Sequence, residues 1–199
     1  MEGKLFIITN RKLIRYGNLC NIAKACAKYG ADAIIIREKD LEDEQLYRLT
    51  IEVKKAVNSS IKVIVNGNYQ VSERSKADGI HFKYNDLLSF HKEYKGIKGV
   101  SIHSLEEAEI VNKIHINYAI AGHIYNTECK KGLEGRGTSF LNKICSAVKA
   151  PVIAIGGINS ENAPEVMKNG ASGIAVMSSI MEAEHPEKIL FNLKESLII

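Results

Sequence analysis

Charged residues at the end of one short apolar run are the first candidates for chemistry. The run Ala33–Arg37 is followed directly by Glu38 and Lys39. Alternation along an extended chain places Arg37 and Lys39 on one side. Guanidinium and ammonium groups bind carboxylates and phosphates. The segment therefore predicts an anion site, with a solvated charge cluster on a loop as the alternative.

A second group near the end of the chain combines glycine with serine. Gly156-Gly157 and Ser178-Ser179 each follow an apolar run. Glycines let backbone N–H groups approach phosphate oxygens, and the serines could open a short helix whose N-terminus faces an anion. In a barrel of parallel strands, the loops after the last two strands form the usual phosphate site. We therefore predict that these four residues bind a phosphate.

Asn66 and Ser101 also stand at the ends of apolar runs. Asn66 could bind a ring heteroatom or a carboxylate, although Asn66-Gly67 also fits a simple turn. Ser101 and His103 share one face of an extended chain, but no acid is placed to orient them as a nucleophile and its base. Ser101 is therefore expected to offer a hydroxyl to a ligand.

His123 is the candidate for proton transfer. Within Tyr118–Ile124, alanines alternate with isoleucines, and we assign the face with Ala119, Ala121 and His123 to the barrel interior. His123 would then project into the mouth of the barrel, beside the glycine-rich segment 127–137. A purely structural histidine is the alternative.

All these candidate residues lie at or just after the end of a strand-like run, and strand-like and helical runs alternate along the chain. The strand-like runs are Leu5–Thr9, Ala33–Arg37, Lys62–Asn66, Gly79–Phe82, Gly99–Ile102, Tyr118–Ile124, Val152–Gly156 and Gly173–Met177. The helical runs are Asn18–Tyr29, Glu42–Val57, Val71–Lys76, Asp86–Tyr94, Leu105–Ile114, Phe140–Val148, Ala163–Lys168 and Pro186–Leu197. Eight such units predict an α/β fold, a single (β/α)8 TIM barrel over residues 1–199, with an open doubly wound sheet as the competitor.

Composition excludes several classes of function. The net charge of +4 comes without a basic stripe, so no nucleic-acid partner is expected. No apolar run approaches the roughly 20 residues of a membrane span. The chain begins directly with a strand-like run, from which we expect a cytoplasmic protein. Its four cysteines lack metal-ligand spacing, so we expect neither a metal site nor disulfides.

With these residues in view, the chain resembles the thiamine phosphate synthase superfamily along nearly its whole length. The segments that carry the resemblance are Arg37–Lys39, Ala77–His81, Gly99–Ser104, Pro151–Ile158 and Gly173–Ser178. Within that superfamily, the run Gly122–Gly137 is similar to the thiazole tautomerase branch. The resemblance implies a barrel of the thiamine phosphate synthase type and a role in thiamine biosynthesis.

The resemblance also implies roles for individual residues. The loop lysine of the synthases falls on Lys130, preceded here by Cys129 where they carry threonine. The synthases place an aspartate that helps to bind magnesium where this chain has Gly67, whereas a second such aspartate is retained as Asp86. Substrate contacts are implied for two further groups: Arg37, Lys39 and Asn66 at the pyrimidine pyrophosphate, and Ser101, Thr127, Gly157, Met177 and Ser178 around the pyrophosphate and the thiazole phosphate.

These features lead to the hypothesis of an isomerase, a thiazole tautomerase. His123 would convert a dihydrothiazole carboxylate phosphate into the aromatic thiazole carboxylate phosphate, without metal or cofactor. The partner would be the phosphorylated thiazole itself, and the resemblance alone points to a homodimer. The alternatives are a thiamine phosphate synthase, which joins a pyrimidine pyrophosphate to the thiazole phosphate, and a non-catalytic thiazole-phosphate sensor or partner-binding barrel.

Overall fold

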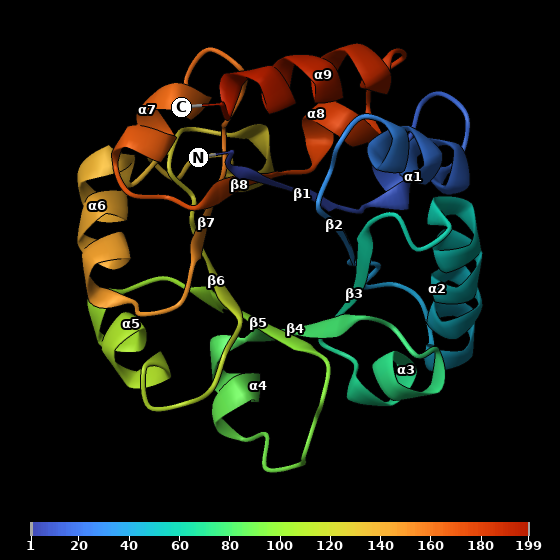
Figure 1. The fold of residues 1–199 in the computed structure, drawn as a ribbon, viewed down its shortest axis with the longest axis horizontal. Helices are drawn as coiled ribbons and strands as arrows, with labels where there is room; N and C mark the ends of the chain where they lie inside the picture. Colours follow the sequence, from blue (N-terminus) through green and yellow to red (C-terminus); the bar gives the residue numbers. More distant parts are fainter. Residues whose placement is uncertain (1, 199) are drawn as a thin grey trace.

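Eight parallel strands close into a barrel in chain order, each neighbour pairing with the next and β8 pairing with β1. This computed structural model describes residues 2–198. The strands are β1 Lys4–Ile8, β2 Ala33–Ile36, β3 Lys62–Asn66, β4 Gly79–Lys83, β5 Ile97–Ile102, β6 Tyr118–Gly122, β7 Val152–Ile155 and β8 Gly173–Val176. The predicted TIM barrel is confirmed, and Figure 1 shows the ring of strands inside a ring of helices.

Helices begin where the sequence offers caps. The Asn18 side chain accepts a hydrogen bond from the backbone N–H of Asn21, and Ser104 accepts one from the N–H of Glu107. The helices are η1 Arg11–Leu13, α1 Leu19–Lys28, α2 Asp43–Val57, α3 Tyr69–Arg74, α4 Tyr84–Leu88, α5 Leu105–Val111, η2 Glu128–Lys130, α6 Gly137–Ala147, α7 Ala163–Lys168, α8 Ser178–Met181 and α9 Pro186–Ser196. None of the helices in residues 2–198 is long and apolar enough to cross a membrane.

The fourth predicted helix, Asp86–Tyr94, is wrong in its bounds. The helix starts at Tyr84 and already ends at Leu88. The chain then runs irregularly and brings the Tyr94 hydroxyl to the Ser72 hydroxyl at 2.7 Å. Tertiary contacts with α3 therefore override the helical periodicity of this segment.

The core has two layers, one inside the barrel and one between the strands and the helices. The prediction that the alanine face of β6 points into the barrel is wrong. Inside the barrel, Tyr118 and Ile120 pack with residues such as Ile35 and Ile153, whereas Ala119 and Ala121 belong to the layer between strands and helices. Strands covered on both faces are apolar on both, so alternation gives the period without saying which face is interior. Small residues on β6 make room for the helices, and Ile120 fills the barrel.

The two ends of the described chain meet beside the start of β1, at the N-terminal end of the barrel. Glu2 forms an isolated antiparallel bridge with Ile198. The N–H of Gly3 donates to the carbonyl oxygen of Leu197 at 3.0 Å. The mouth is built from the C-terminal ends of the strands and the segments that follow them.

Candidate active site

A cavity of about 1180 Å³ lies at the C-terminal ends of the strands. All of the predicted site residues except Lys39 line it. They are Arg37, Asn66, Ser101, His123, Thr127, Cys129, Lys130, Gly156, Gly157, Met177, Ser178 and Ser179. Strand ends that are far apart in sequence thus supply one site, as the barrel fold requires.

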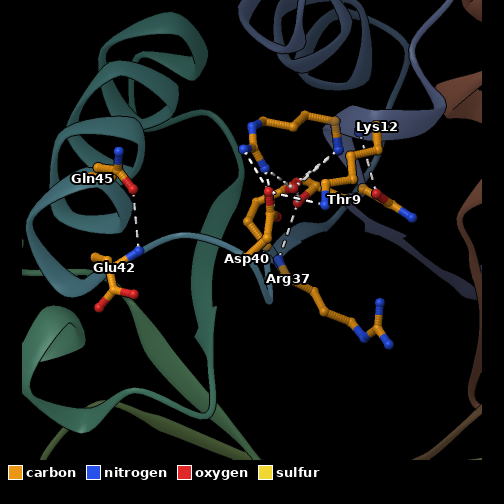
Figure 2. A network of polar contacts seen from close by, with 9 residues as sticks. Thr9, Lys12, Arg37, Asp40, Glu42 and Gln45 are labelled. Atoms are coloured by element: carbon orange, nitrogen blue, oxygen red, sulfur yellow. Dashed lines mark hydrogen bonds and ion pairs between the residues drawn. The ribbon is translucent and has the colours of Figure 1, made fainter.

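A buried carboxylate fixes the chain where β2 ends. Glu38 accepts hydrogen bonds from the Thr9 hydroxyl at 2.6 Å and from the backbone N–H of Arg11 at 3.0 and 3.1 Å. The Thr9 hydroxyl oxygen in turn accepts from the N–H of Arg37 at 3.0 Å. Figure 2 shows the Arg37 side chain pointing away from this network. The sequence analysis missed Glu38, although its alternation with Arg37 and Lys39 already placed it on the opposite side.

Two nearby cations are occupied, which separates them from Arg37 and Lys39. Arg11 donates two hydrogen bonds to Asp40, both at 2.8 Å, and Lys12 lies 3.2 Å from the same carboxylate. The Arg11 guanidinium, with Lys12, holds the pKa of Asp40 well below its usual range. Asp40 therefore neutralises the charges of Arg11 and Lys12, which leaves Arg37 and Lys39 as the cations of this segment that are suited to bind an anion.

A buried histidine forms part of the cavity floor. His81 Nδ1 lies 3.0 Å from the Tyr118 hydroxyl, and Nε2 lies 2.8 Å from the Ser101 hydroxyl. Burial lowers the pKa of His81 to about 3 and raises that of Tyr118, so both stay neutral at neutral pH. A neutral imidazole donates from one nitrogen and accepts at the other, so His81 fixes both hydroxyl orientations.

The histidine that contacts Ser101 is not the one that shares its strand face in the sequence. Ser101 contacts His81, whereas His103 places its Nδ1 3.3 Å from the carbonyl oxygen of Gly122. His81 was visible in the sequence only as the last residue of the segment Ala77–His81, within a strand-like run. Pairing across β4 and β5, which alternation along one strand does not reveal, brings it to Ser101.

The loop after β6 folds back over the mouth. The N–H of Arg136 donates to the His123 carbonyl at 3.0 Å, and the N–H of Gly137 donates to the Ile124 carbonyl at 2.9 Å. The loop carries Thr127, Cys129 and Lys130, all of which line the cavity. His123 lines it too, but β6 has already ended at Gly122, so strand alternation is not what places it there.

The wall that follows β7 and β8 consists of backbone and small side chains. Gly156 and Gly157 have φ values of +104° and +64°, which favour glycine. A Cβ at Gly157 would lie 2.8 Å from Tyr125 Cβ and even closer to the Asn126 carbonyl oxygen. Ser178 opens α8, and the first N–H groups of a helix have no acceptor within it. This wall offers N–H and hydroxyl groups and little charge.

The residues at the mouth do not fit a magnesium ion. Hard divalent ions need several oxygen ligands, with carboxylates foremost. Gly67 supplies none, and Asp86 lies exposed on α4. No group of three or more His, Cys, Asp or Glu in residues 2–198 is arranged to hold a metal. We therefore derive no step through a metal ion.

The fold and the cavity define the class of protein, a (β/α)8 barrel whose polar site lies at the C-terminal mouth. The family model described as thiamine monophosphate synthase matches residues 5–180, and the chain belongs to this family. It is 34% identical over 189 residues to a thiamine-phosphate synthase of Clostridium acetobutylicum, a match that covers 92% of this chain and 90% of that protein.

Two further relatives agree. A thiamine-phosphate synthase of Pyrococcus horikoshii is 33% identical over 195 residues, covering 96% of this chain and 93% of the relative. The solved structure of thiamine phosphate pyrophosphorylase from Pyrococcus furiosus is 30% identical, has a TM-score of 0.84, and is matched over 98% of this chain and 95% of its own.

The tautomerase hypothesis is corrected by these relatives. They are named as synthases, and they match nearly the whole chain, whereas the tautomerase reading gave most weight to Gly122–Gly137. The geometry offers no support for it either. Within residues 2–198, the hydrogen-bond contact of the His123 ring is with the Leu133 carbonyl at 3.3 Å, so no carboxylate orients it as a base.

Proposed function

We propose that this protein is a transferase of the thiamine-phosphate synthase type. It would join a pyrimidine that carries a pyrophosphate to a thiazole phosphate. The carbon–oxygen bond to pyrophosphate breaks, a bond forms between that carbon and the thiazole, and pyrophosphate leaves with the electron pair. The names of the relatives support this reaction class.

One observation carries the proposal: the cavity has two separate anion-binding walls. Arg37 follows β2, whereas the glycine-serine wall, with Gly157 and Ser178, follows β7 and β8. In the closed ring β1 stands between β8 and β2, so the two walls are set apart around the mouth (Figure 1). A volume of about 1180 Å³ is above the common range for a single small ligand, about 300–1,000 Å³. The cavity therefore has room for two phosphorylated substrates.

The residues divide the work between them. Arg37 and Lys130 would bind the pyrophosphate through charge-assisted hydrogen bonds and stabilise the negative charge it gains on leaving. Gly157 and Ser178 would hold the thiazole phosphate through backbone N–H and hydroxyl groups. The Ser101 hydroxyl, oriented by neutral His81, lines the floor of the same cavity. Holding both reactants in line supplies much of the rate enhancement.

The test is release of pyrophosphate from the purified protein. We expect release only when the pyrimidine pyrophosphate and the thiazole phosphate are both present, with stoichiometric formation of the joined product detected by mass spectrometry. Arg37→Gln should reduce the rate. The matched control is Arg74→Gln, because Arg74 is an exposed arginine paired with Glu44 at 2.9 Å.

The contrary outcomes are specific. Binding of both substrates without product would contradict the transferase and leave a binding protein. Pyrophosphate release from the pyrimidine substrate alone would indicate a hydrolase. Equal loss of rate in Arg37→Gln and Arg74→Gln would remove Arg37 from the site.

A further inference from the structure

Four cations gather at one edge of the mouth. Arg37 and Lys39 follow β2, Lys83 ends β4, and Lys130 ends η2 in the loop after β6. The charge of Arg37 lowers the pKa of Lys39, together with partial burial and the charges of Lys83 and Lys130. Arg37 and Lys130 line the same cavity. Lys83 pairs with Ser101 in the β4–β5 register, and it lies two residues beyond His81, on the same inward face of β4. We call the four cations the cation cluster.

The cluster lacks internal neutralisation. Within residues 2–198, no carboxylate lies within ion-pair distance of any of its members, whereas Arg11 and Lys12 nearby share Asp40. Glu38, the one carboxylate between two members in sequence, is buried and accepts its hydrogen bonds from Thr9 and Arg11. Like charges held together cost free energy unless an anion binds among them, and such arrangements mark functional sites.

The same edge is where a magnesium site would need its carboxylates. A Cβ at Gly67 would have no heavy atom within 4 Å, so the space for a side chain exists and is not used. Lys83 precedes Asp86 by three residues on the same edge and adds a positive charge there. The donor set at this edge suits an anion directly, and it repels a cation.

We propose that this chain binds the diphosphate group of its substrate through Arg37, Lys39, Lys83 and Lys130, and that these side chains take the place of a divalent ion. The identity of the ligand rests on the transferase function proposed above. A diphosphate carries several negative charges, and guanidinium and ammonium groups can each donate to its oxygens. Lys83 is the new ligand in this assignment, because the sequence analysis did not single it out.

Calorimetric titration with inorganic pyrophosphate tests the proposal without any turnover. We expect binding in the presence of EDTA, and binding that weakens as monovalent salt rises. Lys83→Gln should weaken it by about tenfold, the usual worth of one charged hydrogen bond. Lys55→Gln is the matched control, because Lys55 is exposed in the last turn of α2, where the helix leads back to the N-terminal end of β3.

A second pair of variants tests the missing metal site. Gly67→Asp should make pyrophosphate binding respond to magnesium, whereas Gly67→Asn should not, once the magnesium–pyrophosphate complex in solution is taken into account. A wild-type protein that responds to magnesium as strongly as Gly67→Asp would overturn the proposal. So would wild-type binding that is lost in EDTA, or Lys83→Gln binding as tightly as Lys55→Gln in a variant whose thermal unfolding is unchanged.

The outcomes also separate this proposal from the transferase function. Metal-free pyrophosphate binding without product formation from the two substrates would leave the cation cluster standing and remove the transferase. Product formation that strictly requires magnesium would do the reverse.

Discussion

The two walls of the cavity, the cation cluster and the glycine-serine wall, offer different kinds of anion-binding group. The cation cluster uses long, charged side chains, and buried Glu38 fixes the chain between two of them, Arg37 and Lys39. The glycine-serine wall uses the backbone itself, pressed against the loop after β6 so closely that Gly157 has no room for a Cβ. Charge can therefore be changed on the first wall with little effect on folding. On the glycine-serine wall, a substitution that changes the shape of the binding surface should also lower the stability of the fold.

The largest effect is expected at Gly157. Gly157→Val should weaken thiazole phosphate binding by at least about a hundredfold, because a displaced wall misplaces every N–H group on it. It should also lower the free energy of unfolding by about 2 kcal/mol, since valine is strained at φ +64° and meets Tyr125 and Asn126. Calorimetry and urea denaturation measure the two effects.

Gly67→Val is the matched control for that variant. Gly67 has a similar φ of +73°, but a Cβ there meets nothing within 4 Å. It should share the backbone strain and lack the collision, and so destabilise less. Normal thiazole phosphate binding by Gly157→Val would show that the phosphate does not contact this wall.

His81 tests the floor that joins the walls. His81→Phe should lower the free energy of unfolding by about 2 kcal/mol, because the buried Tyr118 hydroxyl and the half-buried Ser101 hydroxyl each lose a hydrogen-bond partner. Binding of pyrophosphate in EDTA should change little, because the cation cluster does not depend on the floor. Urea denaturation and calorimetry measure the two quantities.

The same histidine predicts the direction of a pH dependence. The pKa of His81 falls from 6.5 to about 3 on folding. Between these values the unfolded chain binds a proton that the folded chain does not, so stability should fall as pH falls below 6.5, by at most about 1.4 kcal/mol per pH unit. His81→Phe should lack this contribution and His91→Gln should keep it. Identical slopes in all three proteins would contradict burial of His81.

Arg37→Gln should have a smaller effect, and on only one wall. We expect kcat/KM for the pyrimidine substrate to fall by about tenfold, from the loss of one charged hydrogen-bond donor. Thermal stability should stay the same, because the Arg37 backbone N–H keeps its bond to Thr9. Steady-state pyrophosphate release and thermal unfolding check both expectations. A fall in stability as large as that of Gly157→Val would erase the contrast between the walls.

Ser178→Ala should have the smallest effect. One hydroxyl hydrogen bond is worth about 1 kcal/mol, so thiazole phosphate binding should weaken by about fivefold. The backbone N–H groups that do most of the binding remain. Titration with thiazole phosphate measures this, with Ser179→Ala as its neighbour for comparison. A loss equal to that of Gly157→Val would assign the phosphate to the hydroxyl.

The fold and most of the cavity lining could be predicted from the sequence because a barrel turns order along the chain into position in space. Arg37, Asn66 and Ser178 each follow an apolar run, and parallel strands bring such ends to one mouth. The period of a strand also predicted that Ile35 and Arg37 share a side, and both line the cavity.

What escaped prediction depends on contacts between strands. In the sequence, Glu38 is one of three consecutive charged residues with Arg37 and Lys39. Only its hydrogen bonds to Thr9 and Arg11 show that it anchors the segment after β2. His81 lies in a strand that is buried along most of its length, and its partners come from β5 and β6. The inward face of β6 was misassigned for the same reason, since a strand buried on both sides gives no sign of which face is interior.

The meeting of the chain ends has a consequence for rearranging the protein. Because Glu2 pairs with Ile198 at the base of the barrel, a short linker could join the two ends without crossing the mouth. New ends opened in the segment 89–96, which leads from α4 back to the base of β5, would leave every loop after a strand intact. A circularly permuted chain should therefore build the same site from the same eight strand–helix units in a different sequence order.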